Sequence, residues 1–237
     1  MAAAGPSEVV YGRNPVRELL AAGRRRVHEV YALPDLVGEG WLRGVGALPA
    51  TRAALGRLCG SSDHQGVVAV CDPYPYVSER DLVRGGGALV CLDGAQDPRN
   101  LGAVARVVDA AGAAGLVIPE RGSPGVTPTV CKASAGATEH VPIARVSNLA
   151  SFLHDAKQAH RWVVGAATKG AADYRDIEWP EAPVLVLGAE GSGLRTRVRG
   201  LCDLLVTIPM RGRVESLNLS VAAAVLLFEA LRRVQPR

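Results

Sequence analysis

The chain has 237 residues, of which 48% are hydrophobic and 21% are charged, and its formal net charge is +4. This length accommodates one large or two small domains with real cores, and the composition excludes a largely disordered chain. No apolar run is long enough to span a membrane and no leader pattern opens the chain, so we expect a cytoplasmic protein without a membrane partner.

The basic residues are mostly arginine, and the cysteines are few and scattered. Arginine suits phosphate groups and stacked bases, which weakly favours a nucleic-acid partner, although a GC-rich genome produces the same bias. The cysteines are odd in number and have no zinc-ligand spacing, so we expect buried thiols in a reducing compartment and no metal site. They are Cys59, Cys71, Cys91, Cys131 and Cys202.

The first part of the chain, residues 8–72, has the pattern of a small α/β domain. Asn14 and Pro15 predict the start of a helix, with Asn14 as its cap, and Gly23 predicts its end. An irregular stretch rich in glycine, proline and arginine separates the two expected strands. Those strands are Val27–Leu33 and Gly66–Val70.

An arginine triplet, Arg24–Arg26, lies between this helix and the next strand. It is interpreted either as a phosphate contact or as a solvated run of charge, and the sequence leaves both open. Further on, residues 73–87 begin with a proline-rich stretch and end in a run of glycines, which predicts a linker between two domains.

From residue 88 onward strands and helices alternate, which predicts a mostly parallel α/β domain over residues 88–237. The continuous apolar run Val184–Leu187 is typical of a parallel strand covered on both faces. The other expected strands are Ala88–Leu92, Gly115–Ile118, Val141–Ile143, Trp162–Ala166 and Leu204–Ile208. The expected helices are Asn100–Ala113, Val130–Gly136, Leu149–Ala159 and Leu219–Arg232.

A first stretch with functional potential follows the strand that ends near Leu92. Asn100 can cap the following helix, and Arg106, about two turns further on, can reach the same cleft. The alternative is that Asn100 is only a cap and Arg106 only a solvated charge, and the residues alone favour this alternative.

A second stretch, Gly188–Gly193, follows a buried strand, where open α/β sheets bind ligands. Its glycines would let backbone groups approach a ligand closely, and Glu190 can orient a cation or cap a helix. The spacing matches neither a dinucleotide fingerprint nor a phosphate loop, so this signal alone is weak.

A third stretch joins the strand that Pro209 ends to the final, mostly apolar helix. Ser216, Asn218 and Ser220 offer capping oxygens before that helix. A polar, capped loop between buried elements is a common place for function, and an ordinary strand-to-helix turn is the alternative. Elsewhere, His64 is interpreted as structural rather than catalytic.

These three stretches together resemble the SpoU/TrmH family of RNA ribose 2′-O-methyltransferases, in the family's order and over residues 88–233. The first part of the chain, with Tyr11–Leu20 and His64–Val68, looks like the small RNA-binding domain that precedes the catalytic domain in the ribosomal-RNA branch. The matching motifs are Asn100-Leu-Gly-Ala-Val-Ala-Arg106, Leu187-Gly-Ala-Glu-Gly-Ser-Gly-Leu194 and Ile208-Pro-Met-Arg-Gly-Arg-Val-Glu-Ser-Leu-Asn-Leu-Ser-Val221.

The resemblance implies a fold in which the C-terminal segment passes through a loop to form a trefoil knot, although knots are otherwise rare. S-adenosylmethionine would bind in the knot, largely through backbone contacts, and the enzyme would be a homodimer without a metal. The positions that match cofactor contacts are Gly188, Ile208 and Leu217. Arg106 matches the family's catalytic arginine, and the other matching polar site positions are Asn100, Glu190, Ser216 and Asn218.

The implied reaction is methyl transfer to a ribose 2′-hydroxyl of RNA, and the N-terminal domain favours 23S ribosomal RNA as the substrate. A methyltransferase of transfer RNA, a drug-resistance enzyme that marks another ribosomal nucleotide, and a noncatalytic RNA-binding or assembly factor are the alternatives. The modified nucleotide does not follow from sequence, because RNA is recognised largely by shape and by splayed loop bases.

Overall fold

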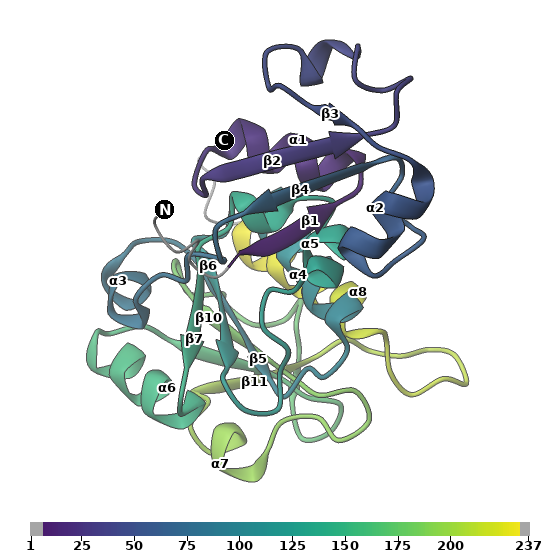
Figure 1. The fold of residues 1–237 in the computed structure, drawn as a ribbon. Helices are drawn as coiled ribbons and strands as arrows, with labels where there is room; N and C mark the ends of the chain where they lie inside the picture. The colour runs from purple at the N-terminus through teal and green to yellow at the C-terminus, as the bar shows by residue number, and fades with distance from the viewer. Residues whose placement is uncertain (1–6, 233–237) are drawn as a thin grey trace.

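The structure is a computed structural model that describes residues 7–232; the last five residues of the predicted second domain lie outside this range. It contains two sheets, a small four-stranded one and a larger seven-stranded one. Figure 1 shows the small sheet, with the purple and blue N-terminal elements, above the larger sheet and its helices.

The small sheet has the strand order β1-β4-β2-β3. Strand β4 is antiparallel to both β1 and β2, while β3 pairs with β2 in parallel. Helices α1 and α2 each pack against β1 and β4 of this sheet. The bounds are β1 Glu8–Tyr11, α1 Arg13–Ala22, β2 Val27–Ala32, β3 Leu48–Pro49, α2 Arg52–Cys59 and β4 Val67–Cys71.

The large sheet has the order β7-β6-β5-β10-β8-β11-β9, and all its strands in the described part of the chain pair in parallel. Its strands are β5 Leu89–Asp93, β6 Gly115–Pro119, β7 Ile143–Val146, β8 Val163–Ala166, β9 Ala172–Asp173, β10 Val184–Gly188 and β11 Leu204–Thr207. The helices are α3 Glu79–Arg84, α4 Pro98–Ala111, α5 Pro128–Ala133, α6 Leu149–Gln158, α7 Thr196–Arg199 and α8 Leu219–Arg232. The predicted mostly parallel α/β architecture is confirmed.

Both faces of the large sheet are covered, because successive side chains of a strand point to opposite sides. Val90 and Leu92 of β5 join the apolar core that includes residues of α4 and α8. Leu89 and Cys91 join a second core with residues of α6. The continuous apolar strands foreseen from the sequence therefore have packing partners on each side.

The start of α1 corrects one prediction. The N-cap position is Gly12, which has a φ of 97°, and no side chain of the cap residue accepts a hydrogen bond there. Instead the Oε1 atom of Gln65 accepts the Arg13 amide at 3.1 Å. Asn14 is therefore not the cap, because an oxygen from a distant loop takes that place. Gly23, in the left-handed conformation, ends the helix as predicted.

Other boundaries also differ from the sequence prediction. Helix α2 forms inside the stretch expected to be irregular, where Thr51 accepts the Ala54 amide and Gly60 ends the helix. Strand β7 begins where the predicted strand Val141–Ile143 ended. Residues 73–87, expected as a linker, contain α3, and the Tyr76 hydroxyl accepts the Val126 amide at 2.7 Å. Residues 73–87 therefore pack against the large sheet and its helices, since α3 contacts β7 and α6.

The three arginines of the triplet have different surroundings. Arg25 is buried and forms an ion pair with the equally buried Glu139, which follows α5. Arg24 donates to the carbonyl oxygens of Glu139 and Val141 at 3.2 and 3.3 Å, and Arg26 remains exposed. For Arg25 both interpretations are wrong, because its charge is neutralised by the buried carboxylate of Glu139.

Candidate active site

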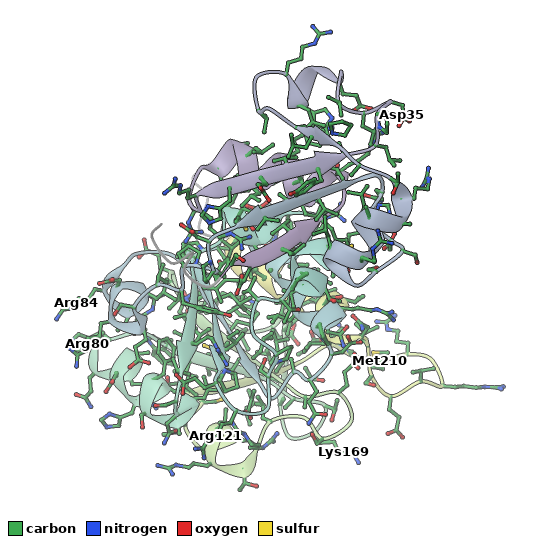
Figure 2. The ribbon with its side chains drawn as sticks, viewed as in Figure 1. Asp35, Arg80, Arg84, Arg121, Lys169 and Met210 are labelled. Carbon is green, nitrogen blue, oxygen red and sulfur yellow. The ribbon has the colours of Figure 1, made fainter. Side chains whose placement is uncertain are left out.

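The three motif stretches meet at the edge where the parallel strands end. Strand β5 ends at Asp93, β10 at Gly188 and β11 at Thr207, and each is followed by one of the motif loops. Ligands of open parallel sheets bind at this carboxyl edge. Figure 2 shows Arg121 and Lys169 at the same edge of the molecule, and Met210 on the loop before α8.

Asn218 joins the three stretches. Its Nδ2 atom donates to Oδ1 of Asn100 at 2.9 Å and to Oε1 of Glu190 at 3.0 Å. Its Oδ1 accepts from the Ser220 amide at 2.9 Å and from the Ser220 hydroxyl at 2.6 Å. Glu190 also accepts the Leu219 amide at 3.4 Å. One side chain thus starts α8 and links it to the loop after β10 and to α4.

Helix α4 begins two residues earlier than predicted. Asp97 is its N-cap and accepts the Arg99 amide at 2.8 Å, while Pro98 occupies the first turn. Asn100 is therefore not a cap, and its side-chain oxygen is available to Asn218. On the helix face opposite this one, Gly102 lies against α5, where a Cβ would come within 2.6 Å of the Val130 carbonyl oxygen.

Arg106 is not in contact with this cluster. In a regular helix it lies about 9 Å further along the axis than Asn100 and about 120° around it. Its side chain is exposed, and it forms no hydrogen bond or ion pair with the residues from 7 to 232. The structure therefore presents Arg106 as an exposed cation on the same helix as Asn100.

The loop after β10 folds back onto the end of that strand. Ala189 and Gly193 exchange two backbone hydrogen bonds of 3.2 and 2.9 Å. A Cβ on Gly188 would lie 2.0 Å from the Gly193 carbonyl carbon, so no side chain fits there. Gly191 and Gly193 have φ of 82° and 67°. The glycines of this motif are thus required by the tight turn itself.

The loop before α8 has a different character. Ile208 and Leu217, at its two ends, are partly buried, whereas residues 209–216 between them, including Ser216, are exposed. No hydrogen bond joins residues 209–217 to the described part of the chain. Figure 1 shows this yellow-green loop projecting from the body of the molecule. Its amide and carbonyl groups are open to a ligand or a partner.

One ion pair at this edge was not foreseen. The carboxylate of Asp93 has no exposed surface, and it forms an ion pair with Nη2 of Arg195 at 2.5 Å. The sequence signal for this ion pair is that Asp93 directly follows the fully apolar run Leu89–Leu92. A carboxylate at the end of a buried strand needs a partner, because burying it alone is costly.

His64 is structural, as interpreted from the sequence. It is buried, and its Nδ1 accepts the Gly66 amide at 3.0 Å. All five cysteines are free thiols, three of them buried. Over residues 7–232 no group of three or more histidine, cysteine, aspartate or glutamate side chains could hold a metal ion. In that same range no helix is long and apolar enough to cross a membrane.

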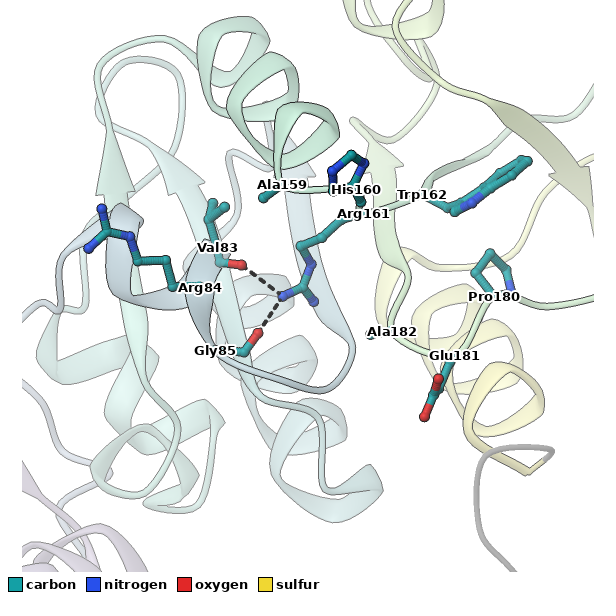
Figure 3. A pocket seen from close by; sticks show the side chains of 10 residues that line it. All are labelled: Val83, Arg84, Gly85, Ala159, His160, Arg161, Trp162, Pro180, Glu181 and Ala182. Atoms are coloured by element: carbon teal, nitrogen blue, oxygen red, sulfur yellow. Dashed lines mark hydrogen bonds between the residues drawn. The ribbon is translucent and has the colours of Figure 1, made fainter.

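A cavity of about 430 Å³ lies at the opposite edge of the sheet, among residues that precede strands. Figure 3 shows Arg161 there, donating to the carbonyl oxygens of Val83 and Gly85. Arg161 thus holds the end of α3, and burial lowers its pKa. Since Asp93 and Gly188 lie at the other ends of these strands, this cavity is separate from the motif cluster.

Comparison with known proteins gives matches over nearly the whole chain. A family model described as the SpoU rRNA Methylase family matches residues 87–228. A second model, described as RNA 2′-O ribose methyltransferase substrate binding, matches residues 9–77. Both cover the parts of the chain that carry the motifs quoted above.

Similar curated proteins and solved structures have consistent names. A 23S rRNA (guanosine-2′-O-)-methyltransferase RlmB from Ralstonia nicotianae is 38% identical, covering 96% of each chain. An AdoMet-bound rRNA methyltransferase from Sinorhizobium meliloti has a TM-score of 0.82 at 29% identity, covering 97% of this chain and 88% of that one. The AdoMet complex of the SpoU methyltransferase AviRb from Streptomyces viridochromogenes has a TM-score of 0.81 at 26% identity, covering 96% and 90%. The chain therefore belongs to the SpoU rRNA methylase family.

Proposed function

We propose that this chain transfers a methyl group from S-adenosylmethionine to a ribose 2′-hydroxyl of RNA at the carboxyl edge of the large sheet. The observation that carries the proposal is the cluster of Asn100, Glu190 and Asn218, which joins three distant motifs on the helix that also carries the exposed Arg106. Family membership and the AdoMet complexes of similar proteins support the cofactor.

The residues at this edge fit S-adenosylmethionine. The backbone over Gly188 leaves no room for a side chain, and the amide and carbonyl groups of the loop from 209 to 217 have no hydrogen-bond partner among residues 7–232. A cofactor held through backbone groups needs this combination of close approach and free donors and acceptors. We assign Gly188, Ile208 and Leu217 to its binding.

The bound cofactor supplies a methyl group on a sulfonium, and the chain must orient the weakly nucleophilic 2′-hydroxyl toward it. We assign Arg106 to the hydroxyl and its adjacent phosphate, because it is an exposed cation without a partner among residues 7–232. Guanidinium binds phosphate through two parallel N–H groups. Asn100, Glu190, Ser216 and Asn218 keep the ribose and the loops in position.

The trefoil knot and the homodimer are part of the same proposal. Helix α8 packs against α4 and β10, and Glu190 contacts the start of α8 from the loop after β10, as expected when the C-terminal segment passes through that loop. The outer face of α8 exposes Val221 and Phe228, 46% and 51% exposed. Two turns apart, they form an apolar stripe that a second copy can cover.

We propose that the enzyme acts in the cytoplasm and that its substrate is 23S ribosomal RNA. The support is the small N-terminal unit, matched by the substrate-binding model, and the relative named for 23S rRNA. By contrast, a structure titled for 2-OH methylation of C/U34 on tRNA covers only 63% of this chain and 97% of its own, with a TM-score of 0.57 and 30% identity. Transfer RNA is thus the second candidate.

The test is transfer of labelled methyl from S-adenosylmethionine to total RNA from cells that lack the protein, followed by mapping of alkali-resistant sites. Wild type and Arg106→Ala are compared, with Arg80→Ala, an exposed arginine of α3, as the control. Label at one 23S site that Arg106→Ala loses supports the proposal. Label confined to transfer RNA overturns the substrate. RNA binding without any methyl transfer indicates a noncatalytic assembly factor.

A further inference from the structure

The loop between β10 and α7 is held at two points, of which only one belongs to the cluster of motif residues. At its tip, Glu190 accepts the side-chain amide of Asn218. At its base, Arg195 is bound to Asp93, the last residue of β5. Asp93 lies beside Gly188 in the parallel register of β5 and β10. The base contact therefore lies directly beside the position where the backbone closes over Gly188.

The contact between Asp93 and Arg195 fixes both the backbone and the side chain of Arg195. Oδ2 of Asp93 accepts the Arg195 amide at 2.8 Å, and Oδ1 accepts Nε at 2.6 Å and Nη2 at 2.5 Å. The carboxylate is fully buried, whereas the Arg195 side chain is 61% exposed. A buried carboxylate without these donors would be costly, so residue 195 has one favourable position.

The position of residue 195 determines where the preceding backbone lies. The carbonyl of Gly193 and the amide of Leu194 would come within 2.3 Å of a Cβ on Gly188. Leu194 packs into the second core beside β8, near Gly165. Since the chain between Gly188 and Arg195 is short and turns sharply, a shift at its base moves the backbone above Gly188.

We propose that Asp93 and Arg195 are a positioning pair for the cofactor loop: their ion pair holds residues 189–194 in the conformation that S-adenosylmethionine requires and carries Glu190 to Asn218. The inference rests on the proposed function, since it concerns the same cofactor. Neither residue touches the reacting atoms. The pair acts through the loop, as partners behind a ligand-binding residue orient it.

Two variants test the pair, and neither removes its packing. Arg195→Lys keeps the charge and the main-chain amide but replaces the fixed guanidinium donors, Nε and Nη2, with a single flexible ammonium group. Asp93→Asn keeps the shape and loses the charge. Arg197→Lys, an exposed arginine on α7 without a partner among the described residues, is the matched control. Folding is checked by circular dichroism and thermal unfolding.

Hydrogen exchange of the loop amides is measured first, without cofactor, because it reports the loop alone. We expect faster exchange at Ala189 and Gly193, whose amides are hydrogen-bonded across the turn, in both pair variants and not in Arg197→Lys. Calorimetry should then show that S-adenosylmethionine binds at least about tenfold more weakly to the pair variants. The reason is that the free energy of one hydrogen bond to a charged group exceeds the free energy that corresponds to a tenfold change in affinity.

Unchanged exchange and unchanged cofactor affinity in folded variants would overturn the proposal, even if their unfolding temperature fell. Should Asp93→Asn fail to fold, Arg195→Lys carries the test alone. If the wild type itself binds no S-adenosylmethionine, the proposed function fails, while the exchange measurement still decides whether the pair positions the loop.

Discussion

Replacing Arg25 by methionine should destabilise the protein strongly, because it removes the partner of a buried carboxylate. Arg25 and Glu139 each have side chains only 1% exposed. Burial by itself lowers the pKa of Arg25, but the hydrogen bond and charge of Glu139 outweigh it and raise that pKa above its usual value. The arginine is therefore charged at every accessible pH, and its loss leaves Glu139 uncompensated.

The magnitude follows from the contacts that disappear. Arg25→Met removes the ion pair to Glu139, a 3.4 Å contact to Glu8 and a cation–π contact of 5.6 Å to Tyr74. Breaking a buried pair on one side costs about 3–5 kcal/mol. For a chain of this size each kcal/mol corresponds to roughly 2–4 °C in Tm, so we expect a fall of roughly 6–20 °C.

Urea denaturation at neutral pH measures the free energy of unfolding, and a double variant separates the pair from its surroundings. In Arg25→Met/Glu139→Leu no buried charge is left unpaired, so the loss should shrink to about 1–2 kcal/mol, mainly the contact with Tyr74. The reasoning is refuted if the single variant unfolds like wild type, or if the losses of the two single variants simply add in the double variant.

Three further predictions concern the site loop, the thiols and the final helix. Gly188→Ala must displace the backbone of Gly193, so we expect stability to fall by about 1–3 kcal/mol in urea denaturation and cofactor binding to be lost in calorimetry. Gly38→Ala, which lies outside the cofactor loops and has nothing within 4 Å of its Cβ, should match wild type, and equal behaviour of both variants would contradict the prediction. Burial raises the pKa of the thiols of Cys71, Cys131 and Cys202 to about 11, so the folded state favours the neutral thiol. The stability that these thiols contribute should therefore be complete below about pH 9 and be lost as the pH rises through about 11. A urea midpoint that stays constant between about pH 8.5 and 10.5 would count against this. The double variant Val221→Glu/Phe228→Glu should be a monomer in light scattering, because the charges disrupt the apolar stripe on α8. The control Leu58→Glu changes an exposed apolar residue of α2 and should leave the dimer intact. A monomeric wild type would contradict the dimer proposal.

The sequence by itself determined the alternation of the main strands and helices of the second part of the chain and the edge of the sheet where the three motifs meet. Apolar strands such as Val184–Leu187, alternating with helices, are enough to predict a parallel sheet, and ligands of such sheets bind where strands end. The three motifs follow strands β5, β10 and β11, so their meeting at one edge was foreseeable. Capping signals failed where a side chain from elsewhere took the role, as Gln65 did at the start of α1.

Only the tertiary structure decided which polar residues pair. Arg25 and Glu139 are far apart in the chain, as are Asp93 and Arg195, and each pair is buried at least on one side. Local patterns report periodicity and caps, which depend on neighbours within a few residues. Whether a charge is solvated, or neutralised by a distant partner, depends on which surfaces the folded chain brings together, and no local pattern contains that information.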